Sequence, residues 1–372
     1  MNFETYPFEK LANLLQDIQP NQDYFPISLT IGEPQFQTPK FIQDELKSKT
    51  ELLNKYPKTA GEEILKNAQI NFMKNRFGIS LKYDELIPTF GTREVLFNFP
   101  QFLLFNKKNP TMAFTNPFYQ IYEGAAIASR ANIIHIDLTK KNNYKPDINS
   151  IDLKSCDLVI INFPNNPTAV SLNLDELIPW VEAALEYDFV LLNDECYSEI
   201  YTDEKPNSLL EASKKIGNSN FKNILVINSI SKRSSAPGLR SGFIAGDSEI
   251  LKEYLRYRTY VGCASPLPLQ YASAIAWSDE IHVKEARKRY KKNFEIAKEI
   301  LDIDIPKATF YIWLEVKNDL EFTKKLYLEK NVKVIPGSFL GRGGIGNTNV
   351  RIALVENEKI TKEAMKRLKE LI

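Results

Sequence analysis

One lysine of this chain stands in a setting that could make it a nucleophile. Lys232 closes the segment Ser229-Ile230-Ser231-Lys232, and the apolar run before it, residues 224–227, has the pattern of a short buried strand. A lysine at the end of such a strand is partly removed from water, which lowers its pKa and favours the neutral amine. A neutral amine can form a Schiff base with an aldehyde. The two serines and the downstream Arg240 are donors suited to a phosphate group.

Taken alone, this lysine could equally lie on the surface in a polar loop. A cofactor-binding role requires that other residues of the chain can bind the remaining parts of an aldehyde cofactor. Tyr119, in Asn116-Pro117-Phe118-Tyr119, offers a ring that can stack on a planar heterocycle. Residues 162–168 contain paired asparagines and prolines, which make a rigid turn with exposed amides. Asp194 follows an apolar run and could pair with a protonated ring nitrogen, which leaves the adjacent Glu195 a structural role. Each of these segments also has an ordinary interpretation as a turn or a core residue.

A fourth segment offers further hydrogen-bond donors for the phosphate group. Gly91-Thr92-Arg93-Glu94 precedes a helical pattern over residues 95–104. The start of a helix presents backbone amides to an anion.

The elements that must position these residues alternate between strand and helix. Strands are predicted at residues 111–115, 133–136, 157–162, 189–193, 224–227 and 242–246, and a helix at 174–187. This alternation favours an α/β fold with a mostly parallel central sheet flanked by helices. Ligands bind such sheets at the carboxyl ends of the strands, where Asp194 and Lys232 are expected.

From about Trp277 onward the pattern changes to that of a smaller α+β domain. Helices are predicted at 280–301 and 320–330 and at the end of the chain, and strands at 310–314, 332–336 and 350–354. We expect an N-terminal segment (1–40) packing with the small domain, a large cofactor-binding domain (41–276) and a small C-terminal domain (277–372). Residues 341–346 match G-x-G-x-x-G, but a strand pattern follows them, so we expect a loop and not a nucleotide site.

Composition excludes several classes of protein. The 372 residues have 48 Lys plus Arg, 47 Asp plus Glu and a net charge of +1, which gives no electrostatic case for nucleic acid or a membrane surface. The three cysteines form no C-x-x-C pair, and two histidines are too few for a multi-histidine metal centre, so no metal is expected. The N-terminus lacks the pattern of a signal peptide and no apolar run is long enough to span a membrane, so we expect a cytoplasmic protein.

In their order along the chain, these segments resemble those of the fold-type I pyridoxal phosphate enzymes, specifically the class I/II aminotransferases. The resemblance extends from Ile31-Gly32-Glu33-Pro34 to Val350-Arg351-Ile352, which is nearly the whole chain. Two departures stand out. Ala169 follows Pro-Thr where the family usually has glycine, and the arm before Ile31 is short.

The resemblance implies that pyridoxal 5'-phosphate is the cofactor and assigns it partners. Lys232 would be its covalent attachment point and the catalytic acid and base. Asp194 would pair with the ring nitrogen, Asn166 and Tyr197 would bond the ring hydroxyl, and Tyr119 would stack on the ring. The phosphate would be held by Thr92 and Arg93 (through their backbone amides), Ser229, Arg240 and, from a neighbouring subunit, Tyr56.

For the substrate, the resemblance implies that Arg351 clamps the α-carboxylate, assisted by Asn166 and the backbone of Gly32. The implied activity is ping-pong amino transfer between glutamate or 2-oxoglutarate and another amino or keto acid. The resemblance also implies a homodimer, with no nucleic acid or membrane partner. The prolines after Asn116 and Asn166 are candidates for cis peptides.

The sequence pattern of the whole chain narrows the range of candidate substrates. Residues 6–11 and 116–124 look like those of the succinyldiaminopimelate aminotransferases of lysine and cell-wall biosynthesis. Aspartate, aromatic or methionine aminotransferases and C–S lyases of the same fold remain alternatives. A non-catalytic regulator is disfavoured, because Ile31-Gly32-Glu33-Pro34 begins too early to leave room for a preceding DNA-binding domain.

Overall fold

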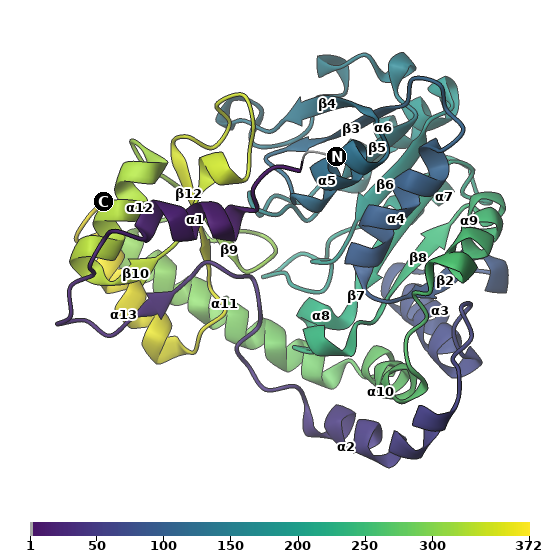
Figure 1. Ribbon diagram of the computed structural model, residues 1–372, viewed down its shortest axis with the longest axis horizontal. Helices are drawn as coiled ribbons and strands as arrows, with labels where there is room; N and C mark the ends of the chain where they lie inside the picture. The colour runs from purple at the N-terminus through teal and green to yellow at the C-terminus, as the bar shows by residue number, and fades with distance from the viewer. Residues whose placement is uncertain (1–2) are drawn as a thin grey trace.

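The computed structural model describes residues 3–372 and places a large sheet beside a smaller one (Figure 1). The large sheet has the spatial order β2-β8-β7-β6-β5-β3-β4. Its strands are β2 (Leu86–Thr89), β3 (Thr111–Asn116), β4 (Asn132–Asp137), β5 (Leu158–Ile161), β6 (Val190–Asp194), β7 (Ile224–Ser229) and β8 (Gly242–Gly246). Only β8 runs antiparallel to its neighbours. The prediction of a mostly parallel sheet is confirmed.

Strand β2 is the one strand of this sheet that the sequence pattern does not predict. It is short, and Pro88 lies within it, where a proline argues against a strand because it cannot donate a hydrogen bond. In the structure β2 lies at the edge of the sheet and pairs with β8 alone. An edge strand tolerates a missing donor, because one side of it has no ladder to complete.

Helices cover both faces of the large sheet. One face packs against α3 (Glu63–Phe77), α6 (Leu174–Tyr187), α7 (Leu209–Lys215) and α10 (Leu267–Ser278), and the other against α4 (Thr92–Leu104), α5 (Ile121–Ala128) and α9 (Ser248–Val261). Strand β5 shows the alternation, since Val159 and Ile161 join the first core and Leu158 and Ile160 the second. Within residues 3–372, no helix combines the length and apolarity that crossing a membrane requires.

The smaller sheet is antiparallel, in the order β11-β12-β9. It contains β9 (Tyr311–Glu315), β11 (Ile335–Pro336) and β12 (Asn349–Ala353), and the helices beside it are α11 (Ile281–Leu301), α12 (Asp319–Lys330) and α13 (Glu358–Lys369). The strand predicted at 332–336 is wrong as a single element. It is divided at Val334, because β10 (Val332–Lys333) pairs with an N-terminal strand and β11 pairs with β12.

The N-terminal segment lies against this C-terminal part, as Figure 1 shows. Strand β1 (Ile27–Ser28) pairs in parallel with β10. Helix α1 (Pro7–Leu15) packs Leu11 and Leu15 against Ile335 and Leu340. Helix α2 (Lys40–Ser48) then leads the chain into the large sheet's layer of helices.

Three features of the loops bear on the sequence analysis. The glycine-rich residues 341–346 form turns and not the start of a helix, as predicted. The peptides before Pro117 and Pro167 are cis, as the resemblance suggested, and the peptide between Phe163 and Pro164 is cis without having been predicted. Ala169 is buried with φ of 62°, a left-handed conformation that explains why glycine is usual there.

Candidate active site

A cavity of about 770 Å³ opens at the carboxyl ends of β5, β6 and β7, between the large sheet and the C-terminal part. Its wall contains eleven of the residues predicted for the site: Gly32, Thr92, Arg93, Tyr119, Asn166, Asp194, Tyr197, Ser229, Lys232, Arg240 and Arg351. Tyr56 is the exception. It follows the short helix η1 (Thr50–Asn54), and its side chain is fully exposed at 101%.

Lys232 lies in the single turn α8 (Ile230–Arg233), directly after β7. Ser229 caps this turn, because its hydroxyl accepts a hydrogen bond from the backbone amide of Ser231. The lysine amine donates to the carbonyl oxygen of Gly32. Burial among protein atoms at the bottom of the cavity lowers the pKa of Lys232 to about 8. The neutral amine is therefore well populated near physiological pH, as the sequence analysis predicted.

Asp194 ends β6 and is buried, with 5% of its surface exposed. Its carboxylate accepts hydrogen bonds from the Tyr122 hydroxyl (2.9 Å) and from the backbone amide of Cys196 (3.2 Å), which are both neutral donors. Burial raises the pKa of this carboxyl. A cationic partner would stabilise the ionised form, so the position suits a protonated ring nitrogen.

Tyr122 is a site residue that sequence reasoning missed. It lies in α5, about one helical turn after Tyr119, and its ring is buried. Tyr119 precedes α5, and Asp194, the partner of Tyr122, lies 72 residues away in the sequence, so no local pattern indicated this role for Tyr122. Its bond to Asp194 orients the carboxylate toward the cavity.

The residues predicted to bind the phosphate lie together at the start of α4, where two of them are arginines. Gly91 caps that helix with φ of 75°, and a Cβ atom there would lie 2.4 Å from a guanidinium nitrogen of Arg240. Arg240 donates to the carbonyl oxygens of Pro237 (2.9 Å) and Phe90 (3.5 Å), and burial together with the charge of Arg93 lowers its pKa. Two cations beside a helix N-terminus would be stabilised by a bound phosphate.

Arg93 does more in the structure than its predicted backbone role. Its guanidinium donates to the Tyr119 hydroxyl at 2.8 Å and lies at the cavity wall. Burial raises the pKa of Tyr119, so this hydroxyl stays protonated. The contact fixes the orientation of the ring that is predicted to stack on the cofactor.

Arg351 is buried on β12 and lies beside Asn166 at the cavity wall. It donates to the Asn166 side-chain oxygen (2.9 Å) and to the carbonyl oxygen of Thr30 (2.7 Å). Its Nε has no hydrogen-bond partner among the described residues. Since these acceptors are neutral, the guanidinium charge is available to a carboxylate, which pairs with arginine in a bidentate manner.

Tyr197 and Gly32 both lie beside Tyr311, a second tyrosine that the sequence analysis did not single out. The Tyr197 and Tyr311 hydroxyls lie 2.9 Å apart, and the ring of Tyr311 lies 4.5 Å from the Arg351 guanidinium carbon. A Cβ atom on Gly32 would lie 1.8 Å from the Tyr311 hydroxyl, so glycine alone fits at this position.

Glu195, beside Asp194, has the structural role that was expected. It is buried and accepts hydrogen bonds from the Ser208 hydroxyl (3.0 Å), the Leu209 amide (2.8 Å) and the Asn193 side chain (3.1 Å). These contacts hold the start of α7 against the end of β6.

Comparison with known proteins agrees with this arrangement. The model of the family "Aminotransferase class I and II" matches residues 26–368. An LL-diaminopimelate aminotransferase of Natranaerobius thermophilus is 30% identical over 99% of this chain and 97% of its own length. The crystal structure of the aminotransferase AspB from Helicobacter pylori is 51% identical with a TM-score of 0.97, covering 100% of this chain and 99% of its own. An aminotransferase structure from Neisseria meningitidis is 39% identical with a TM-score of 0.94, covering 100% and 98%.

Proposed function

This chain belongs to the class I and II aminotransferases, and from that premise we propose that it transfers an amino group between glutamate and the keto acid that corresponds to N-succinyl-LL-2,6-diaminopimelate. Aminotransferases of this fold use pyridoxal 5'-phosphate. The cofactor would supply an aldehyde that condenses with amines and a ring that withdraws electrons from the substrate α-carbon.

The residues of the cavity fit this cofactor. We assign its covalent attachment to Lys232, its ring nitrogen to Asp194 and its ring face to Tyr119. We assign the ring hydroxyl to Asn166 and Tyr197. We assign the phosphate to Thr92, Arg93, Ser229 and Arg240, which all line the cavity. The buried carboxylate of Asp194, bonded to neutral donors, and the two neighbouring arginines are the observations that support this fit.

Two side chains would then act on the substrate. Arg351 binds the α-carboxylate and thereby fixes where the α-carbon lies. The Lys232 amine, with its pKa lowered to about 8, would remove the proton from the substrate α-carbon as a base and would deliver it, as an acid, to the carbon of the cofactor that carries the amino group. Ping-pong kinetics are expected.

The choice of a long substrate is supported by where the resembling segments lie. Tyr6, Pro7 and Phe8 from the first segment and Gln120 and Ile121 from the second all line the cavity. Both segments that resemble the succinyldiaminopimelate enzymes are therefore positioned to contact a bound substrate. The name of the Natranaerobius relative favours a second candidate with the same carbon skeleton, LL-diaminopimelate without the succinyl group.

A panel of amino donors with 2-oxoglutarate as the acceptor tests this choice. We expect kcat/KM for N-succinyl-LL-2,6-diaminopimelate to exceed that for aspartate, aromatic amino acids and methionine by at least about tenfold, the size of one well-formed substrate contact. LL-diaminopimelate in the same panel decides between the two candidates. A clear preference for aspartate would refute both of them, and pyruvate release from cysteine conjugates without any acceptor would indicate a C–S lyase.

We also propose a homodimer in which Tyr56 reaches the phosphate of the partner subunit. Tyr56 is exposed in this chain, as are Leu53 (72%) and Tyr260 (92%), so these apolar side chains are available to an interface. We expect Tyr56→Phe to weaken cofactor binding by about tenfold or more, since a hydrogen bond to a charged group is lost. Fluorescence titration of the cofactor measures this loss, and Tyr83→Phe, also exposed, is the control. Sedimentation as a monomer would contradict the proposal.

A further inference from the structure

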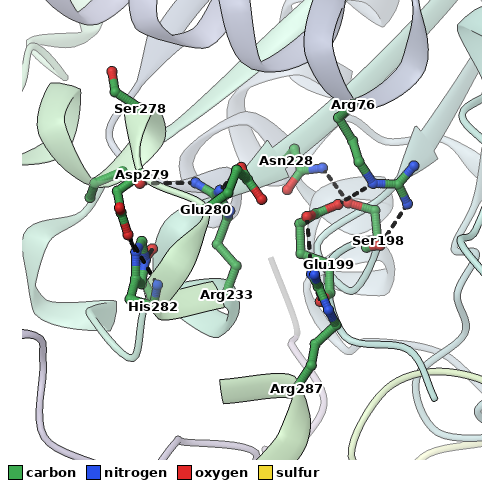
Figure 2. A network of polar contacts seen from close by, with 12 residues as sticks. Arg76, Ser198, Glu199, Asn228, Arg233, Ser278, Asp279, Glu280, His282 and Arg287 are labelled. Carbon is green, nitrogen blue, oxygen red and sulfur yellow. Dashed lines mark hydrogen bonds and ion pairs between the residues drawn. The ribbon is translucent and has the colours of Figure 1, made fainter. Parts of the chain in front are cut away.

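Lys232 is followed by two buried residues, Arg233 and Ser234, that contact residues at the start of helix α11. Figure 2 shows Arg233 beside Glu280. The Arg233 guanidinium is 1% exposed and donates to Glu280 at 2.5 Å and to the carbonyl oxygen of Ala276 at 3.1 Å. Glu280 is the residue that precedes the first turn of α11. The segment of the nucleophilic lysine is thus joined by an ion pair to the base of this helix.

Ser234 makes a second connection to the same place. Its hydroxyl lies 2.8 Å from Nε2 of His282, and Nδ1 of His282 lies 2.5 Å from Asp279. Asp279 precedes α11 and His282 lies in its first turn, and Figure 2 shows the two side chains next to each other. Two consecutive residues after Lys232 therefore contact one helix terminus.

The next turn of α11 contacts the segment directly after Tyr197, a residue of the cavity wall. Arg287 lies 3.5 Å from the carboxylate of Glu199, which also pairs with Arg76 at 2.6 Å. Glu199 and Ser198 follow Tyr197 directly, and Ser198 accepts a hydrogen bond from Asn228, the residue before Ser229. These contacts fix the base of α11 relative to both β6 and β7.

The same helix is bonded farther along to the strand of Arg351. Asn293, buried within α11, donates its side-chain amide to the carbonyl oxygens of Leu354 (3.1 Å) and Glu356 (2.7 Å), just beyond β12. From Glu280 to Asn293 the helix rises about 20 Å. One continuous element is therefore bonded near Lys232 at one point and near Arg351 at another.

We propose that α11 is a strut that sets the distance between the Lys232 amine and the Arg351 guanidinium, and that Glu280 and His282 are positioning residues for amino transfer. The inference rests on the proposed roles of Lys232 and Arg351. Arg351 decides where the substrate α-carbon lies, and Lys232 must reach its proton. A displacement of about 1 Å between two such groups can lower a rate by about 100-fold.

A double-mutant cycle tests the coupling. We expect Glu280→Ala to lower kcat/KM for glutamate by roughly tenfold when Arg351 is present, and by less than about twofold in an Arg351→Ala background, because the strut then has no guanidinium to position. Lys288→Ala is the control, since it removes an ion pair with Glu285 on the same helix (2.8 Å) and should leave kcat/KM unchanged.

The outcomes separate the two proposals. An equal loss in both backgrounds, or no loss from Glu280→Ala, would overturn the strut and leave Arg351 as the carboxylate clamp. An Arg351→Ala variant with full activity would instead overturn the proposed clamp. Glu280→Gln, which keeps an acceptor oxygen for Arg233, should lose less than Glu280→Ala does.

Hydrogen exchange on the cofactor-free protein gives a readout independent of activity. We expect the backbone amides of residues 230–234 to exchange about tenfold faster in Glu280→Ala than in the parent chain, and not faster in Lys288→Ala. His282→Asn, which removes the second connection, should show the same change and serves if Glu280→Ala does not fold. Unchanged exchange in His282→Asn and Glu280→Ala would overturn the proposal.

Discussion

Replacing Lys232 by alanine should abolish amino transfer, with a loss of about 10⁵-fold or more, because we propose that this one side chain is both the attachment point of the cofactor and the acid and base. Borohydride reduction of the loaded parent enzyme should fix the cofactor to the peptide that contains Lys232, and the alanine variant should show no such adduct by mass spectrometry. An adduct on the variant, or amino transfer within tenfold of the parent rate, would refute the assignment.

A second buried lysine provides the matched control. Lys66 on α3 is 4% exposed, its pKa is also lowered to about 8 by burial, and its amine lies 3.8 Å from the centre of the Tyr83 ring. It lies outside the cavity wall. Lys66→Met should therefore keep the kcat of the folded enzyme. This result would indicate that the position of Lys232 in the cavity, and not a lowered pKa by itself, makes its amine reactive.

The lowered pKa of Lys232 should be measurable in the cofactor-free protein. Below a pH of about 8 the Lys232 amine is protonated and unreactive, and above it the neutral amine dominates. Acylation of Lys232, followed by peptide mass spectrometry, should thus rise with pH around a midpoint near 8 and not near the usual value of about 10.4.

Replacing Arg351 by alanine should lower kcat/KM for amino acids by about 100- to 1,000-fold while cofactor binding stays within about twofold of the parent. The expected loss is that of removing one partner from a buried, hydrogen-bonded charge pair, about 2–5 kcal/mol. Arg351→Lys should fall between the parent and the alanine variant, because lysine keeps the charge without the planar fork. Steady-state kinetics and a cofactor titration on each variant measure the two quantities.

Arg367 is the control for this second substitution. It is a buried arginine of α13 that pairs with Glu363 (2.8 Å) and bonds the carbonyl oxygen of Phe25, away from the cavity wall. Arg367→Gln should retain the kcat/KM of the folded enzyme. Parent-like kcat/KM in Arg351→Ala, or loss of the cofactor from it, would refute the role given to Arg351.

The sequence could predict that these site residues lie close together, because each of them directly follows a predicted strand. Asp194 ends β6 and Lys232 follows β7, and the carboxyl ends of neighbouring parallel strands must meet. Each residue was identified from the apolar run that precedes it. The same reasoning placed Asn166 after β5.

The supporting contacts could not be predicted, because they join residues that only the tertiary fold brings together. Tyr122 bonds Asp194 from another element, and Tyr311 reaches Tyr197 from the C-terminal part. The ion pair of Arg233 with Glu280 also joins residues far apart in the sequence, 47 positions from each other. A lone tyrosine or arginine carries no local sign of such a partner. Strand β2 escaped prediction for the opposite reason, since Pro88 gave a local sign against it.

The N-terminal segment has a practical consequence for how this enzyme should be produced. Tyr6, Pro7 and Phe8 line the cavity, and farther on Thr30 and Gly32 bond Arg351 and Lys232. An affinity tag at the N-terminal end would stand only a few residues before the cavity-lining Tyr6, whereas Ile372 at the other end is 60% exposed. Purification tags therefore belong at the C-terminus, and an isolated fragment that begins at residue 41 would lack the two backbone carbonyls that bond Lys232 and Arg351.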